Sequence, residues 1–161
     1  MLATITFVLL AVLFIVLKLV LVVQMKEICV IERLGKFRAV LPPGLHFLIP
    51  FVDRVAYRHE TREQVLDIPA QSCISRDNVQ ISVDGLVYIQ VMDGERASYG
   101  IEDYRRASIN LAQTTMRSEI GKLNLGQTFS ERDTLNETIV REIDKASDPW
   151  GLKSYAMKCV T

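Results

Sequence analysis

Residues 79–91 read VQISVDGLVYIQV, and this stretch carries the strongest structural signal in the chain. Its odd-numbered positions, from Val79 to Val91, are apolar or glycine, whereas most of the even-numbered positions are polar. Side chains on a β-strand alternate between the two faces of a sheet, so this period of two predicts a long antiparallel strand with one buried face. Gly85 in the middle of the stretch predicts a bulge or a bend.

Shorter strand signals precede this stretch. Residues 26–32, 52–57 and 64–68 are rich in β-branched or aromatic side chains and are bounded by turn residues, so each is predicted as a strand. Pro42, Pro43 and Gly44 predict a turn, because two fixed φ angles precede a residue that is free to adopt a positive φ.

The segment after residue 93 has the period of helices. Residues 95–99 predict a short helix. Asp103 is predicted to cap a helix that runs to about residue 122. Ser130 is predicted to cap a second helix that runs to about residue 147, because Asp133 follows three positions later. Residues 152–160 are predicted to be extended. Strands followed by helices indicate an α+β fold. The two predicted apolar helix stripes are Ile109, Ala112, Met116, Ile120 and Leu123, and then Leu135, Ile139, Ile143 and Ala146.

Residues 2–23 form an apolar run in which only Thr4, Thr6 and Lys18 are polar. As a helix the run would be roughly 33 Å long, enough to cross a hydrocarbon core of about 30 Å. The sequence therefore predicts an N-terminal transmembrane helix, with the anchor over residues 1–24 and one folded domain over residues 25–161. A cleaved signal peptide and a buried helix of a soluble core are alternatives, but the run is long for the first and apolar on every side for the second.

Basic residues flank this run on one side only. No Lys or Arg precedes it, whereas Lys26, Arg33, Lys36 and Arg38 follow it. The positive-inside rule then predicts a single-pass membrane protein whose folded domain lies on the cytoplasmic side.

The chain has a balanced charge, with 19 basic and 19 acidic residues. Nucleic-acid binding is not expected, because the sequence has no basic stripe. The cysteines are Cys29, Cys73 and Cys159, and their odd number and wide spacing exclude a disulfide framework. Cys29 follows the apolar run closely and is a candidate for S-palmitoylation, with a core-facing strand residue as the alternative.

The sequence offers few residues for catalysis. His46 and His59 are the only histidines, and neither belongs to a zinc-protease motif with a second His four residues later. Asp67, Asp77 and Asp84 are candidates for paired carboxylates, although solvated Asp at turns and strand ends is the more ordinary interpretation. The sequence has no phosphate-binding glycine loop and no nucleophile motif. The chain is therefore predicted not to be an enzyme and to bind no metal or cofactor.

A second apolar segment follows soon after the predicted anchor. Its large side chains are predicted to contact the lipid bilayer, because the anchor would hold them close to one leaflet. A core strand is the alternative. These residues are Leu45, Phe47, Leu48, Ile49 and Phe51.

Several consecutive segments form a longer pattern. They read ERLGKF at residues 32–37, PGLHFLIPFVD at 43–53, REQVLDIP at 62–69, DNV at 77–79, QTTMRSEIG at 113–121 and DPWGL at 148–152. In this order they resemble the SPFH, or band-7, family of stomatins, prohibitins, flotillins and the bacterial HflK and HflC proteins. Within the family, the chain is most similar to the stomatin-like (slipin and paraslipin) branch.

The resemblance implies a non-enzymatic membrane scaffold that assembles with copies of itself or with longer family members. Such a scaffold organises or regulates integral membrane proteins, such as channels or proteases, in a membrane microdomain. Accessory regulation of a membrane protease and lipid sensing are alternative functions. Arg117, Glu119 and Arg132 are candidate subunit contacts, with a solvated helix face as the alternative. The family's C-terminal coiled coil is expected to be absent from this sequence, which also departs from the family pattern after Trp150.

Overall fold

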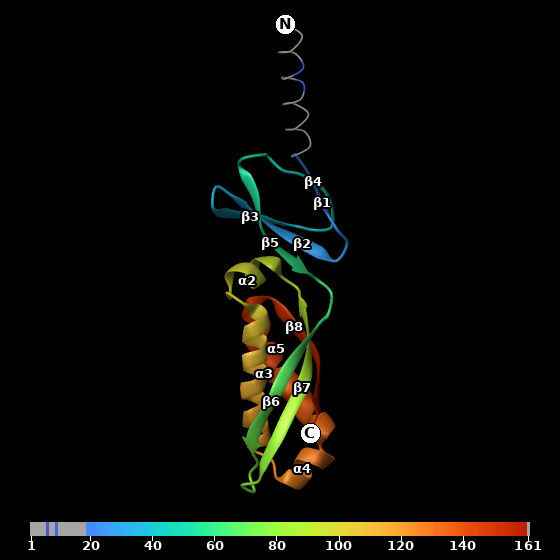
Figure 1. The fold of residues 1–161 in the computed structure, drawn as a ribbon, viewed down its shortest axis with the longest axis vertical. Helices are drawn as coiled ribbons and strands as arrows, with labels where there is room; N and C mark the ends of the chain where they lie inside the picture. The colour runs from blue at the N-terminus through green and yellow to red at the C-terminus, as the bar shows by residue number, and fades with distance from the viewer. Residues whose placement is uncertain (1–5, 7–8, 10–18, 161) are drawn as a thin grey trace. The chain divides into compact units, whose positions relative to one another are not determined.

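The computed structural model describes residues 6, 9 and 19–160, without the side chain of Val160. The chain divides into two compact units, Met1–Thr61 and Arg62–Thr161, which are called the first and the second unit below. Figure 1 shows strands in both units and helices packed on the strands of the second unit. This combination of antiparallel sheets and helices confirms the predicted α+β class.

The second unit is built on a three-stranded antiparallel sheet with the strand order β6-β7-β8. The strands are β6 (Gln64–Ile74), β7 (Gln80–Val91) and β8 (Leu152–Val160). The central strand β7 is the one predicted over residues 79–91, and burial alternates along most of it as the sequence pattern predicts. The strands predicted over residues 64–68 and 152–160 are confirmed as well, and the first of them is longer than predicted.

Gly85 marks a close approach between strands. A Cβ atom at this position would lie 2.9 Å from the backbone oxygen of Lys158 on β8. On the other side Gly85 pairs with Ile68, and the register of β6 shifts between Ile68 and Gln71. The predicted irregularity is therefore present, but the extra residue lies on the neighbouring strand.

The helices of the second unit are α2 (Gly94–Tyr99), α3 (Tyr104–Ile120), α4 (Leu125–Ser130) and α5 (Arg132–Ser147), followed by a 3-10 turn, Asp148–Trp150. Asp103 caps α3 as predicted, because its carboxylate accepts hydrogen bonds from the backbone N–H groups of Arg105 and Arg106 at 3.0 and 3.1 Å. The predicted cap at Ser130 is wrong. Ser130 ends α4, which the sequence pattern did not predict, and α5 begins after Glu131.

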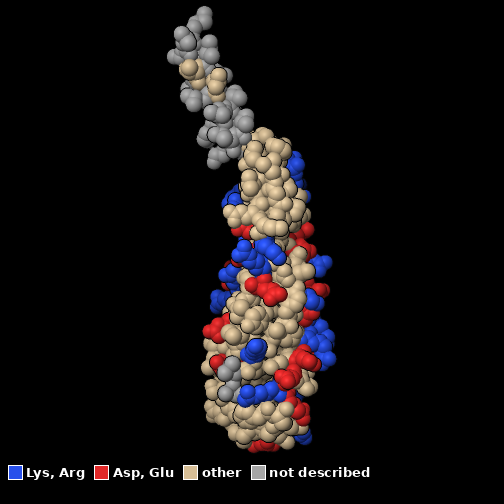
Figure 2. All heavy atoms as spheres, turned by 90° about the vertical axis from the view of Figure 1, so that its right-hand side faces the viewer, with Lys and Arg blue, Asp and Glu red and all other residues tan. Residues whose placement is uncertain are grey.

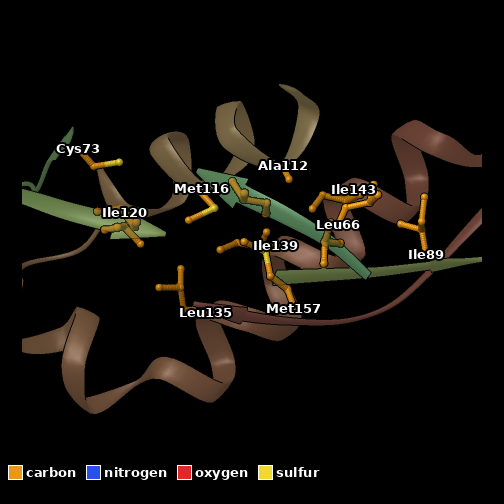
Figure 3. Packing of buried hydrophobic residues seen from close by; sticks show 13 residues of the cluster. Leu66, Cys73, Ile89, Ala112, Met116, Ile120, Leu135, Ile139, Ile143 and Met157 are labelled. Atoms are coloured by element: carbon orange, nitrogen blue, oxygen red, sulfur yellow. The ribbon is translucent and has the colours of Figure 1, made fainter. Parts of the chain in front are cut away.

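The core of the second unit lies between the sheet and the helices α3 and α5. Figure 3 shows side chains from both layers meeting there. Ala146, predicted to face this core, is exposed, and Ser147 is buried in its place with its hydroxyl donating to the backbone oxygen of Asp144 at 3.3 Å. The other predicted stripe residues are buried or pack against the cluster: Ile109, Ala112, Met116, Ile120, Leu123, Leu135, Ile139 and Ile143.

The first unit contains two small antiparallel sheets. The strands are β1 (Val20–Val23), β2 (Glu27–Arg33), β3 (Lys36–Leu41), β4 (Gly44–Phe47) and β5 (Asp53–Glu60). One sheet has the order β3-β2-β5, and the other pairs β1 with β4. The predicted strands over residues 26–32 and 52–57 correspond to β2 and β5, whereas β1 and β3 were not predicted. Val23, Cys29 and Ile31 form the buried core of this unit.

Most of the predicted transmembrane helix lies outside the described residues. Val20–Val23 form β1, so the prediction that the helix extends to Val23 is wrong for these four residues. The physical reason is that β-branched valines favour a strand when a partner strand is present, and β4 supplies it. Among the helical residues that the structure describes, no helix is long and apolar enough to cross a bilayer.

Candidate membrane-facing surface

The two-stranded ribbon of β1 and β4 presents an apolar face to solvent. Its register pairs Val20 with Phe47 and Val22 with Leu45. Directly opposed residues of antiparallel strands project from the same face. These four side chains are 39%, 68%, 64% and 59% exposed, in that order. Figure 2 is viewed from the side on which β1 and β4 lie in Figure 1, and this part of the first unit is tan, with Lys and Arg at its edges.

The opposite face of the ribbon packs on the core of the first unit. Val23 is only 4% exposed, and Leu21 packs against the same cluster. Leu48 belongs to this inner group too, so the prediction that it contacts the membrane does not agree with its position. The backbone N–H of Leu48 donates to the backbone oxygen of Leu19 at 2.8 Å. The pairing therefore continues one residue beyond β4, and the side chains there still alternate between the core and the exposed face.

Asp53 fixes the turn that follows β4. Its side chain has no solvent exposure, and Arg33 donates to both carboxylate oxygens at 2.7 and 3.1 Å. Arg38 donates to the second oxygen at 2.6 Å, and the backbone N–H of Ile49 donates to the same oxygen at 3.0 Å. The hydrogen bonds from Arg33 lower the pKa of Asp53 to about 2, although desolvation of the carboxylate acts in the opposite direction. The hydrogen bond from the Ile49 N–H and the charges of Arg33 and Arg38 lower this pKa further.

Two apolar residues occupy exposed turn tips in the left-handed region of backbone space. Phe51 has φ 70° and is 91% exposed, and Leu34 has φ 51° and is 81% exposed. The tips are connected, because the backbone N–H of Leu34 donates to the oxygen of Val52 at 3.3 Å. Non-glycine residues in this region store strain, and such strain is concentrated at functional sites.

The ribbon face and the turns together expose an unusual number of large apolar side chains for so small a unit. Isolated exposed apolar residues are ordinary, but larger groups of them mark interaction sites. They are named the apolar set below: Val20, Val22, Leu34, Leu45, Phe47, Ile49 and Phe51.

The structure buries the cysteine that was a candidate for palmitoylation. Cys29 is 1% exposed in the core of the first unit, and burial raises the pKa of its thiol. Acylation would require β2 to leave this core. The alternative, a strand residue that faces the core, agrees with the structure, so the palmitoylation prediction is not retained.

The candidate subunit-contact charges have interactions within the second unit. Arg117 donates to the side-chain oxygen of Gln71 on β6 at 2.9 Å. Glu119 accepts from Lys122 at 2.6 Å, and the guanidinium of Arg132 lies 5.3 Å from the ring centre of Phe129. Arg117 and Arg132 remain exposed, and the contacts of the three residues described above are with different neighbours.

The residues considered for catalysis have local roles. The His46 ring nitrogen Nε2 lies 2.8 Å from the backbone oxygen of Pro42, and the His59 ring stacks on Tyr57 at 6.3 Å between centres. Burial lowers the pKa of His59. Asp77 accepts a hydrogen bond from the first backbone N–H of α4 at 3.1 Å. Within the described residues, no three His, Cys, Asp or Glu side chains come together as a metal site.

Part of the apolar set was not predicted from the sequence. Val20 and Val22 were hidden in a uniformly apolar run, which shows no period of two. Leu34 precedes Gly35 in a tight turn between two strands, and an apolar residue at such a position is the one local signal that could have identified it.

Comparisons with known proteins agree with this architecture. Residues 21–158 match the family described as SPFH domain / Band 7 family. The chain is 50% identical over 131 residues to stomatin-like protein stl-1 of Caenorhabditis elegans. The aligned residues cover 81% of this chain and 40% of that protein. It is 48% identical over 134 residues to human stomatin-like protein 2, mitochondrial, covering 83% of this chain and 38% of that protein.

An archaeal relative is similar over a comparable length. The chain is 42% identical over 137 residues to a stomatin homologue of Pyrococcus horikoshii, which covers 85% of this chain and 51% of that protein. The chain thus spans between about two fifths and half of the length of these relatives. The family match covers both the antiparallel sheets and the helices that follow them. The chain therefore belongs to the SPFH domain / Band 7 family, in its stomatin-like branch.

Proposed function

We propose that this chain is a non-enzymatic, membrane-attached scaffold that assembles into oligomers and organises or regulates integral membrane proteins. In this proposal residues 1–24 contain the single membrane anchor, the folded domain lies on the cytoplasmic side, and the apolar set contacts the adjacent leaflet. Channels and proteases are the kinds of partner that the family resemblance suggests.

The observation that carries the proposal is the exposed apolar face of the β1–β4 ribbon. The ribbon starts at Val20, inside the apolar run of residues 2–23, so a membrane anchor in this run would hold the ribbon at the lipid surface. Full burial of a Val, Leu, Ile or Phe side chain contributes about 1.5–3 kcal/mol. Insertion of even half of the apolar set would therefore contribute on the order of 5 kcal/mol.

Fluorescence quenching by lipids tests the position of the apolar set. The full chain is reconstituted into vesicles of phosphatidylcholine with brominated acyl chains, with Trp150→Phe removing the single native tryptophan. A tryptophan introduced by Phe51→Trp should then be quenched strongly. The matched control is Phe129→Trp, which replaces a 49% exposed aromatic residue of the second unit and should be quenched weakly. Equal quenching at the two positions, or none at position 51, contradicts the proposal.

The scaffold proposal also predicts which residues do not matter. Replacement of His46 and His59 by Ala should leave oligomer size and lateral clustering in vesicles unchanged, whereas deletion of residues 2–18, which keeps the strand β1, should abolish clustering. Energy transfer between labelled copies of the chain measures clustering. Loss of a substrate turnover in the histidine variants would favour a protease-related role, and binding that follows lipid composition without any partner would favour lipid sensing.

A further inference from the structure

Among the described residues, the sheet of the second unit ends at β6 on one side and at β8 on the other. An edge strand presents a row of backbone N–H and C=O groups that can pair with another extended chain unless they are blocked. On β6, Pro69 and Ala70 lie at the shift in register, and proline has no backbone N–H group. The covalent structure of β6 therefore interrupts this edge permanently.

The edge of β8 is closed in a different way, by side chains of α5. Asp144 accepts a hydrogen bond from the backbone N–H of Ser154 at 3.1 Å, and its second carboxylate oxygen accepts one from Lys153 at 3.2 Å. Nearer the start of α5, the Oδ1 atom of Asn136 accepts from the backbone N–H of Cys159 at 3.4 Å. These side-chain oxygens occupy the places of the carbonyl oxygens that a neighbouring strand would supply.

Between these two contacts, β8 borders a groove of about 630 Å³. The groove is lined by Val140 and Arg141 of α5 and by Ala156 and Met157 of β8, among others. The helix therefore does not cover this part of the strand. Tyr155 is an extra residue of β8 in its pairing with β7, and a bulge of this kind hinders strand addition only locally. The two contacts at the ends of the groove are thus the main obstacle to an extended chain.

We propose that Asn136 and Asp144 form an autoinhibitory cap, called the edge cap below, which prevents β8 from accepting an additional strand. The cap is reversible, because an incoming strand could replace its two hydrogen bonds, whereas the interruption at Pro69 cannot be replaced. β8 is therefore the edge of this sheet at which strand addition is controlled. The inference goes beyond the proposed scaffold function. It uses neither the apolar set nor the membrane anchor, so the two proposals can fail separately.

The two contacts of the edge cap differ in strength. The hydrogen bond to Asp144 has a charged acceptor, and such bonds are roughly twice as strong as bonds between neutral groups. The ion pair with Lys153 also holds the Asp144 carboxylate against β8. The hydrogen bond to Asn136 has a neutral acceptor and is longer. We therefore expect Asp144 to contribute more to the cap than Asn136.

Amide hydrogen exchange of the full chain in detergent, measured by NMR, tests the edge cap at single residues. Asp144→Ala should speed the exchange of the Ser154 amide roughly tenfold or more, because this amide loses its acceptor. Asp144→Asn keeps an oxygen acceptor and should retain most of the protection. Asn136→Ala should speed the exchange of the Cys159 amide by a smaller factor, and Asn136→Asp should preserve its protection.

Glu142→Ala is the matched control for these variants. It removes a carboxylate from the same helix, but this carboxylate pairs with Lys145 of α5 at 3.0 Å and not with β8. The exchange of the Ser154 and Cys159 amides should therefore remain as in the wild type. Unchanged exchange of the Ser154 amide in Asp144→Ala, or equal acceleration in Glu142→Ala, overturns the proposal.

Formation of β-rich aggregates tests whether the cap blocks strand addition. The variant with both Asn136→Ala and Asp144→Ala should become positive for thioflavin T, and sediment, roughly tenfold sooner than the wild type. This factor corresponds to the loss of about one hydrogen bond. Ile139→Ala is the control for general destabilisation, because it weakens the core and leaves both caps in place. All chains are compared at urea concentrations that give the same unfolded fraction. Equal aggregation rates of the double variant and Ile139→Ala would mean that unfolding, and not an open edge, causes aggregation, and the proposal would then be wrong.

Discussion

The guanidinium of Arg33 and the carboxylate of Asp53 form a bidentate pair of hydrogen bonds, although the two residues are 20 positions apart in sequence. The pair joins the end of β2 to the start of β5, and Arg38 of β3 donates to the same carboxylate. The hydrophobic cluster of the first unit is small among the described residues. The hydrogen bonds between the buried Asp53 carboxylate and the two arginines therefore contribute strongly to holding its strands and the turn at Phe51 in place.

Replacement of the buried carboxylate should therefore destabilise the first unit. In Asp53→Asn the amide presents an N–H group to the guanidinium where an oxygen accepted before, and both arginines lose their counter-charge. The midpoint of thermal unfolding of the detergent-solubilised chain should fall. Glu63→Gln removes the charge of an exposed carboxylate and should leave the midpoint unchanged. An equal midpoint for both variants would contradict the role assigned to Asp53.

The same pair predicts how stability depends on pH. The pKa of Asp53 is lowered to about 2 in the folded chain, so its stabilising contribution is fully present above its unfolded pKa, near 4. The contribution is lost as the pH falls through the folded value. The difference in unfolding midpoint between the wild type and Asp53→Asn should be constant above about pH 5 and shrink between about pH 4 and 2. A difference that grows on acidification would be inconsistent with this pair.

The core of the second unit should be sensitive to cavities. Ile139 is 0% exposed between α5 and the sheet, and Ile139→Ala is expected to lower the free energy of unfolding by about 2–5 kcal/mol. Val65→Ala, at a position of β6 that is 53% exposed, should change it by less than about 0.5 kcal/mol. Chemical denaturation with helix content as the signal measures both.

The stability that the cap of α3 contributes should depend on the hydrogen-bond acceptor at position 103 and not on the size of its side chain. Asp103→Ala removes the acceptor for two backbone N–H groups and is expected to cost about 1 kcal/mol. Asp103→Asn keeps an oxygen acceptor of the same shape and should retain most of the stability. Equal losses in the two variants would show that the charge of Asp103, and not its hydrogen bonds, stabilises the helix.

Sequence patterns predicted the parts of the fold that local rules determine. The period of two identified β7, and the cap at Asp103 with its apolar stripe identified α3, because each signal is long and lies within one element. The six-residue helix α4 was missed, although Asn124 and Gln127 form a capping box that marks its start.

Long-range and uniform features could not be predicted in this way. The strand β1 begins at Val20, inside the apolar run, because its residues pair with β4. A uniformly apolar sequence does not reveal this pairing. The inward position of Leu48 follows from the same pairing. The pairing of Arg33 with Asp53 brings residues from different strands together, and only the folded first unit shows it.

Phe51 connects strain with the proposed membrane contact. Its backbone has φ 70°, which glycine adopts freely and phenylalanine does not, while its side chain is 91% exposed and contributes little packing. Phe51→Gly should therefore leave the unfolding midpoint unchanged or raise it, and at the same time weaken the contact of the turn with lipid. Quenching by brominated lipid of a tryptophan introduced by Phe47→Trp, in the Trp150→Phe background, reports that contact. Asn78 also has a positive φ, 62°, in a turn of the second unit, so Asn78→Gly is the control that should spare both quantities. A marked loss of stability in Phe51→Gly would show that Phe51 is retained for folding and not for the membrane.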